Sequence, residues 1–131
     1  MYDRTTWKVP SYKSNQDESV WKKQCKKWST LVEGHDVPPL MTNFVDMKLP
    51  KEITNELNNR SIKRPTLMQM QVLPVALSGR DMVGISFTDS GKIFTFALLS
   101  LMMSLEEEEV RPLGALLTLS RELSRQTYEV L

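Results

Sequence analysis

Residues 82–96 read MVGISFTDSGKIFTF, and this stretch decides the fold predicted for the chain. A short apolar run leads into a polar turn that ends in Gly91 and Lys92, and a longer apolar segment follows. Strand, glycine turn and helix in this order form the context of a phosphate-binding loop. The start of a helix offers unpaired backbone N–H groups and the positive end of the helix dipole, and both favour phosphate. Lys92 would add a mobile charge near the β- and γ-phosphates.

The match to the phosphate-loop pattern G-x-x-x-x-G-K-[ST] is incomplete. The pattern falls on residues 86–93, where Gly91 and Lys92 fit and Ser86 replaces the first glycine. Ile93 stands where a Ser or Thr hydroxyl should bind Mg²⁺, and its side chain carries no oxygen. An ordinary turn between a strand and a helix is the alternative, and these residues alone leave both interpretations open.

Two further segments strengthen the phosphate-loop interpretation. Upstream lies SIKRPTLMQMQ at 61–71, preceded by Phe44, and downstream lies LSRELSRQT at 119–127. The three segments resemble, in order, the Q motif, motif I and motif Ia of DEAD-box RNA helicases, whose usual forms are G-x-x-x-P-T-P-I-Q, A-x-T-G-S-G-K-T and P-T-R-E-L-A. The residues that keep the family identity are Pro65, Thr66, Gln69, Thr88, Ser90, Gly91, Lys92, Arg121, Glu122 and Leu123. Those that depart from it are Ser61, Leu67, Asp89, Ile93, Leu119 and Ser124.

The resemblance narrows to the Abstrakt-type DEAD-box helicases in residues 6–12, 31–39 and 78–88, and it extends over nearly the whole chain. It implies a nucleotide site that binds ATP or ADP weakly and lacks one Mg²⁺ anchor because of Ile93. It assigns no catalytic residue and no metal ligand. The cofactor-binding residues that it implies are Phe44, Arg64, Gln69, Thr88, Asp89, Ser90, Gly91, Lys92 and Ile93.

Two of these residues have a structural alternative. In the family, the aromatic ring at Phe44 stacks on adenine, but here the ring can equally anchor the preceding linker to the core. The Gln69 amide has one acceptor and two donors, which complement N6 and N7 of adenine. Thr66 and Gln69 also form the capping-box pattern Thr-x-x-Gln, which needs no ligand. The two roles of Gln69 would compete for the same side chain.

Motif Ia implies an RNA contact at Arg121 and Glu122, with Arg121 as the candidate phosphate partner. The alternative is an exposed arginine that pairs with Glu122 or Glu129 and contributes little to stability. The net charge is +1, so global charge does not argue for nucleic acid. Any RNA partner is therefore implied by the resemblance alone.

The composition bounds the class of protein. With 131 residues, 40% of them hydrophobic, the chain is one domain or part of one. One cysteine and one histidine allow no internal disulfide and no His/Cys metal cluster. The first residues do not resemble a signal peptide, and the longest apolar run, at 93–105, is too short to span a bilayer. No membrane partner is expected, and the resemblance implies a nuclear or cytoplasmic location.

Residues 1–43 are predicted to form an N-terminal extension. Residues 1–15 are polar and aperiodic, which predicts an extended arm, with a disordered tail as the alternative. Residues 16–32 predict an amphipathic helix whose apolar stripe includes Cys25, a packed small residue rather than a nucleophile. Its other face carries lysines at 22, 23, 26 and 27. This face is either a contact for RNA or a partner, or a solvated surface.

Residues 44–131 predict an α/β fold, an incomplete first RecA-like domain. Helices are expected at 49–59, 66–77, 93–105 and 120–131, with buried parallel strands at 83–87 and 113–119. A two-stranded parallel sheet cannot cover both its faces with so few helices. The chain is therefore expected to be marginally stable or to need a partner.

The 131 residues contain no Asp-Glu-Ala-Asp and no Ser-Ala-Thr segment. The resemblance implies that ATP-driven RNA unwinding requires these segments and a second RecA-like domain. Three hypotheses stay open. The chain is a helicase-like fragment with residual nucleotide or RNA binding and no hydrolysis. Alternatively, it is a non-catalytic module that engages partners of a full-length helicase, such as spliceosomal proteins, through residues 1–45. The third possibility is a degenerate copy without a stable fold.

Overall fold

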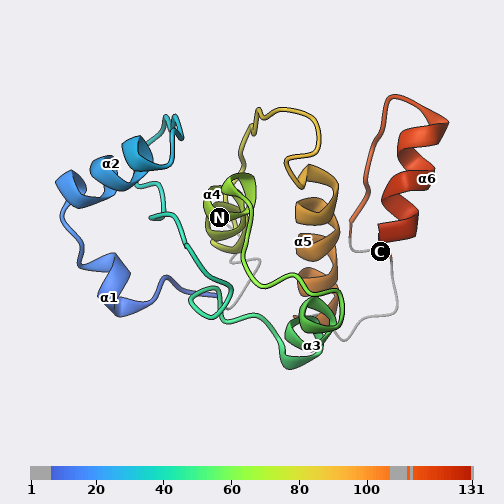
Figure 1. Cartoon of the computed structure of the whole chain (residues 1–131), viewed down its shortest axis with the longest axis horizontal. Helices are drawn as coiled ribbons and strands as arrows, with labels where there is room; N and C mark the ends of the chain where they lie inside the picture. Colours follow the sequence, from blue (N-terminus) through green and yellow to red (C-terminus); the bar gives the residue numbers. More distant parts are fainter. Residues whose placement is uncertain (1–6, 107–111, 113, 131) are drawn as a thin grey trace.

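A computed structural model describes residues 7–106, 112 and 114–130. Within them the chain forms six helices and no strand. Figure 1 shows α2, α4, α5 and α6 in a row, with α1 near α2 at one end and α3 at the foot of the molecule. α5 packs against both α4 and α6. The helices are α1 (Ser11–Ser14), α2 (Glu18–Lys27), α3 (Lys51–Asn59), α4 (Leu67–Leu77), α5 (Lys92–Glu106) and α6 (Arg121–Val130).

α4 is the central helix, and local signals define both its ends. Thr66 caps its start in a complete capping box with Gln69. Gly79, just past its end, has a φ of 75°, the left-handed geometry that glycine tolerates. All residues of α4 except Leu67 and Ala76 are buried, so the helix is covered on nearly every side. The predicted span 66–77 is confirmed.

A proline inside α4 connects this helix to the N-terminal extension. Pro74 has no N–H, so the carbonyl of Met70 loses its helical partner four residues later. The backbone N–H of Met41 donates to that carbonyl at 2.8 Å instead. The Gln71 amide adds a second contact by donating to the carbonyl of Pro38 at 3.0 Å. The segment 38–41 therefore lies along α4.

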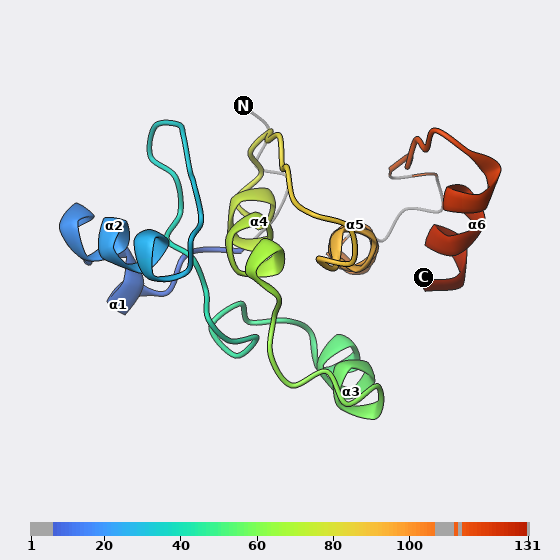
Figure 2. The same ribbon diagram turned by 45° about the horizontal axis from the view of Figure 1, so that its top comes forward.

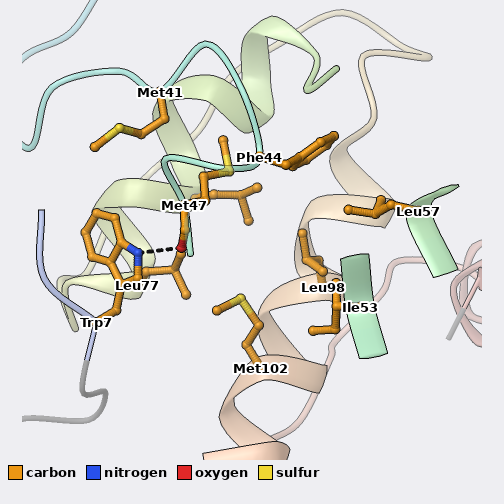
Figure 3. Packing of buried hydrophobic residues seen from close by; sticks show 10 residues of the cluster. Trp7, Met41, Phe44, Met47, Ile53, Leu57, Leu77, Leu98 and Met102 are labelled. Atoms are coloured by element: carbon orange, nitrogen blue, oxygen red, sulfur yellow. Dashed lines mark hydrogen bonds between the residues drawn. The ribbon is translucent and has the colours of Figure 1, made fainter. Parts of the chain in front are cut away.

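The main core cluster joins the N-terminal arm to residues of α3, α4 and α5. Figure 3 shows Trp7 from the arm beside Met47, with its indole N–H donating to the Met47 carbonyl at 2.6 Å. Trp7 is buried, and Pro10 and Lys13 are buried as well. A disordered tail is therefore wrong for residues 7–15, which include the short helix α1, while residues 1–6 lie outside the described part. The cluster consists of Trp7, Met41, Phe44, Met47, Ile53, Leu57, Leu73, Leu77, Leu98 and Met102.

A second cluster holds α2 against α4. Cys25, Leu40 and Met70 are buried together, and Trp21 and Trp28 pack on them. Burial raises the pKa of the Cys25 thiol, which keeps it protonated and inert. The predicted amphipathic helix is confirmed over residues 18–27, and its lysines at 22, 23, 26 and 27 are exposed.

The two predicted strands are not formed in the described residues. Residues 83–87 lack regular secondary structure, and the side chains of Val83, Ile85 and Phe87 are 91%, 93% and 91% exposed. Residues 114–119 likewise form no strand, and Leu117 is 97% exposed, while Leu113 lies outside the described residues. A strand requires backbone partners on a neighbouring segment, and neither segment has one in the described chain. The expectation of buried strands is therefore not confirmed, because the described residues are helical where they have regular structure.

α5 and α6 confirm the predicted helices with a modest shift of their ends. α5 is buried along Thr95, Ala97, Leu98 and Met102, but Phe96, Leu101 and Leu105 are exposed. One side of α5 is therefore covered and the other is partly exposed. α6 begins after Ser120, whose hydroxyl accepts from the N–H of Leu123 at 3.2 Å. Figure 2, turned from the first view, keeps α6 on the far side of α5 from α4. None of the described helices combines the length and the apolar character needed to cross a membrane.

Candidate nucleotide-binding site

The start of α4 and the loop before α5 meet, although the residues that join them, Thr66 and Ser90, are 24 positions apart in sequence. The Thr66 hydroxyl donates to the carbonyl of Ser90 at 2.8 Å. Thr66 uses the same hydroxyl to accept from the N–H of Gln69 at 3.4 Å, so one side chain caps the helix and holds the loop. The structure thus brings together the upstream motif and the glycine turn that the sequence analysis singled out.

Gln69 lies between these two segments and is only 3% exposed. Its side-chain oxygen accepts from the Thr66 N–H at 3.0 Å, which completes the capping box. Its Nε2 lies 2.9 Å from the position that a Cβ on Gly91 would occupy. Gly91 also has a φ of 83°, so both the close approach and the backbone geometry require glycine there. The structural role of Gln69 is therefore realised, and its acceptor atom is already in use.

The loop itself is closed by contacts among its own residues. The Lys92 ammonium donates to the carbonyls of Ser86 and Phe87 at 2.7 and 2.6 Å. The hydroxyls of Ser86 and Ser90 lie 2.6 Å apart. Lys92 is also the first residue of α5, and the carbonyl of Gly91 accepts from both the N–H and the hydroxyl of Thr95. Hydrogen bonds therefore join residues 86 and 87, which enter the turn, to residues 90 and 92 at the start of α5.

Asp89 lies at the tip of this loop with a φ of 61°. This left-handed conformation is one that glycine adopts without strain and that aspartate adopts at a cost. Its carboxylate is exposed, and Thr88 beside it is exposed as well. An anionic ligand at the loop would meet this negative charge.

The loop fits a phosphate group in part and does not fit Mg²⁺ as the family form would. A phosphate would find the N-terminus of a 15-residue helix, a glycine without a Cβ and a lysine one residue on. Ile93, half-buried in the first turn, offers a metal ion no oxygen. Among the described residues, no group of three or more His, Cys, Asp or Glu side chains could hold a metal ion.

The remaining predicted nucleotide residues are not gathered at the loop. Phe44 is buried in the main core cluster, in keeping with a ring that anchors the linker between α2 and α3. Arg64 is exposed in the turn before the Thr66 cap. No hydrogen bond within the described residues orients either side chain toward a ligand, so their nucleotide roles stay predictions.

The predicted RNA residues lie in the first turn of α6, and both Arg121 and Glu122 are exposed. α5 and α6 begin at the same end of the molecule in Figure 1, so this turn lies on the same edge as the loop. The nearby ion pair is between Arg125 and Glu129 at 3.0 Å, one helical turn apart and exposed. Arg121 therefore stays accessible to a phosphate from outside the chain.

Sequence reasoning missed the interaction of Ser86. In the sequence, Ser86 was recognised only as a replacement of the first glycine, whereas in the structure its hydroxyl is a partner of the Ser90 hydroxyl. The spacing of four residues across a tight turn was the available signal. The effect of Pro74 was missed as well. A proline inside a helix has no N–H, so it leaves the carbonyl four residues earlier without its helical partner.

Known proteins resemble the chain over nearly its full length. It is 42% identical over 133 residues, 96% of its length, to DEAD-box ATP-dependent RNA helicase 35 of Arabidopsis thaliana. It is 39% identical over 135 residues to the ATP-dependent RNA helicase abstrakt of Drosophila melanogaster. The chain belongs to the DEAD-box RNA helicase family. It covers 22% of the length of each of these two relatives.

A solved RNA helicase structure is also similar to the chain. The crystal structure of the RNA helicase Prp28 from Chaetomium thermophilum, bound to ADP, superposes with a TM-score of 0.78 at 27% identity. The match covers 95% of this chain and 31% of that one. No protein-family model matches the chain. The resemblance stated from the three motifs, including the Abstrakt-type relatives, is confirmed.

Proposed function

We propose that this DEAD-box chain is a helicase-like module that binds ADP or ATP weakly at the loop 86–93 and does not hydrolyse ATP by itself. The observation that carries the proposal is the contact between the two motifs. The Thr66 hydroxyl donates to the Ser90 carbonyl, and Gly91, which has no Cβ, lets the side chains of Thr66 and Gln69 approach closely. Lys92 and the start of α5 are the groups that would bind a diphosphate in this arrangement. That the similar Prp28 structure is bound to ADP supports the choice of ligand.

The test is a titration of the folded chain with fluorescently labelled ADP. Lys92→Met should weaken binding by about tenfold or more, because a charge-assisted contact to phosphate contributes on the order of 1.5–3 kcal/mol. Lys51→Met is the matched control, since Lys51 is an exposed lysine in the first turn of α3. Equal affinity of the wild type and Lys92→Met for the nucleotide would contradict the proposal.

Binding of Mg²⁺ together with the nucleotide is expected to be weak. The family implies ATP with Mg²⁺, but Ile93 provides no ligand atom in the first turn of α5. We therefore expect ADP affinity to change less than about twofold when Mg²⁺ is added. No turnover is expected from residues 1–131, because they contain no Asp-Glu-Ala-Asp segment to organise metal and water.

The proposed RNA contact is at Arg121, with Glu122 beside it. Arg121 is exposed in the first turn of α6, on the same edge as the loop. Since few cations lie there, RNA affinity should be low, and because the contact is electrostatic it should fall further as salt is added. A titration of a short single-stranded RNA at two salt concentrations measures this, and tight binding that ignores salt would contradict it.

The fold of the complete module is proposed to be RecA-like α/β. Residues 83–87 and 114–119 are apolar and lack strand partners in the described chain, whereas the relatives are several times longer. We infer that both segments become strands when further strands lie beside them. In this division residues 44–131 form an incomplete first RecA-like domain and residues 1–43 its extension.

A second candidate function is a non-catalytic interaction module. The observation in its favour is the exposed lysine face of α2, at residues 22, 23, 26 and 27, which no core cluster uses. Partners of a longer helicase, including spliceosomal proteins in the nucleus or cytoplasm, are the proposed targets. A folded chain that binds no nucleotide would favour this function, and a chain with no cooperative melt would favour the degenerate copy.

A further inference from the structure

Ser90 is held from two sides before any ligand is considered. Its hydroxyl lies 2.6 Å from the hydroxyl of Ser86, on the segment that enters the loop. Its carbonyl accepts from the Thr66 hydroxyl at the start of α4 at 2.8 Å. Ser86 and Ser90 are both half-buried, so water competes only in part for these contacts. The turn between them cannot open without breaking at least the hydroxyl pair.

Lys92 reinforces the same closure. Its ammonium donates to the carbonyls of Ser86 and Phe87, so the cation points back at the entering segment. A phosphate at the start of α5 needs that charge, and the ammonium must leave at least one carbonyl to supply it. Ser86 therefore touches the loop twice, through its hydroxyl to Ser90 and through its carbonyl to Lys92.

We propose that the hydroxyl pair of Ser86 and Ser90 is a latch that keeps the loop self-closed, and that ADP or ATP binds only to the open loop. The proposal rests on the proposed nucleotide binding, and it names the closed loop as the cause of the low affinity. Family motif I has alanine where Ser86 stands, and alanine has no hydroxyl with which to form this pair. When the binding-competent state is only a fraction of the population, the apparent affinity falls by that fraction.

The size of the effect follows from a single neutral hydrogen bond. Removing the Ser86 hydroxyl should raise the open fraction, and hence the ADP affinity, by about fivefold, which corresponds to ~1 kcal/mol. The Lys92 contacts to backbone carbonyls survive the substitution, so the loop is not expected to open fully. Ser86 acts here as a positioning residue that sets the loop state.

The experiment compares the wild type with Ser86→Ala and Ser86→Thr by two readouts. Without nucleotide, amide hydrogen exchange of the peptide spanning the loop should speed up in Ser86→Ala and stay near the wild-type rate in Ser86→Thr, which keeps a hydroxyl. With labelled ADP, Ser86→Ala should bind about fivefold more tightly. Ser100→Ala is the control, because its hydroxyl bonds only one turn back within α5, to the Phe96 carbonyl.

The two readouts separate the latch from the nucleotide site. Unchanged exchange in Ser86→Ala overturns the latch, whatever the nucleotide does. Faster exchange with unchanged ADP affinity in a chain that binds ADP overturns the coupling between latch and ligand. Absence of ADP binding in every variant overturns the proposed function and the coupling with it, and the exchange comparison then still decides whether the latch exists.

Discussion

Replacing Asp89 with glycine tests the loop most directly. Asp89 adopts a φ of 61° at the tip of the loop, where its carboxylate is exposed. Glycine removes the left-handed strain, roughly 1 kcal/mol, but adds freedom to the unfolded chain of about the same size. The free energy of unfolding should therefore change by less than about 1 kcal/mol. The main effect should be on ligand binding.

The expected gain in affinity comes from removing like charge. A carboxylate about 5 Å from a phosphate costs roughly 3 kcal/mol at an effective dielectric near 20. Because Asp89 is exposed, solvent reduces this figure, and we expect at least a tenfold rise in affinity, ~1.4 kcal/mol. Adding Ile93→Thr should make binding depend on Mg²⁺, since the threonine hydroxyl is the missing ligand type.

The assay is a titration with labelled ADP, with and without Mg²⁺, alongside a thermal melt. Asp36→Gly is the matched control, because Asp36 is also an exposed aspartate with a φ of 49°. It undergoes the same substitution and loses the same charge, but lies in the segment between α2 and α3. An equal rise in both variants would show a general charge effect. A folded Asp89→Gly chain with wild-type affinity would refute the reasoning.

Three further predictions concern the cap, the arm and the unpaired segments. Gln69→Ala should lower the free energy of unfolding by about 1 kcal/mol, because the capping box is lost, and should change ADP affinity less. Melts and ADP titrations measure the two effects, and a larger effect on affinity than on stability would support an adenine contact. A hydrogen bond to Asp46 raises the pKa of Tyr12 to about 12, so stability from this contact should be complete below pH 10 and lost between pH 10 and 12. Absorbance titration of tyrosinate should show this component in the wild type and not in Tyr12→Phe. Ile85→Lys should leave the melting temperature nearly unchanged, because this side chain is exposed; unfolding by this variant would show that residues 83–87 are buried as a strand after all.

The helices could be predicted because their signals are local. Thr66 and Gln69 complete a cap within four residues, and Gly79 ends the same helix by its own backbone geometry. The glycine turn before α5 could be recognised in the same way. The contact between turn and cap was not predicted; it is the structure that joins the two segments, through the Thr66 to Ser90 hydrogen bond.

Whether residues 83–87 and 114–119 form strands could not be predicted from these segments alone. A strand forms only when its backbone hydrogen-bonds to a neighbouring strand. Residues 83–87 have the apolar, β-branched composition of a buried strand, yet the side chains of Val83, Ile85 and Phe87 are exposed in the described chain. Composition reports what a segment can do when partners are present. The backbone donors and acceptors that would pair with such a segment belong to strands distant in sequence, and the segment itself does not show where those strands lie.

Pro74 leads to a non-local contact that the sequence does indicate. A proline within α4 leaves the Met70 carbonyl without its helical donor, and a buried carbonyl without a partner costs roughly 1–3 kcal/mol. Some other N–H must therefore approach Met70, and the structure shows that it is Met41. This contact crosses the predicted boundary at residue 44, and Trp7 crosses it again in the core cluster. The extension and the following helices are therefore one packing unit, whatever division of function they serve.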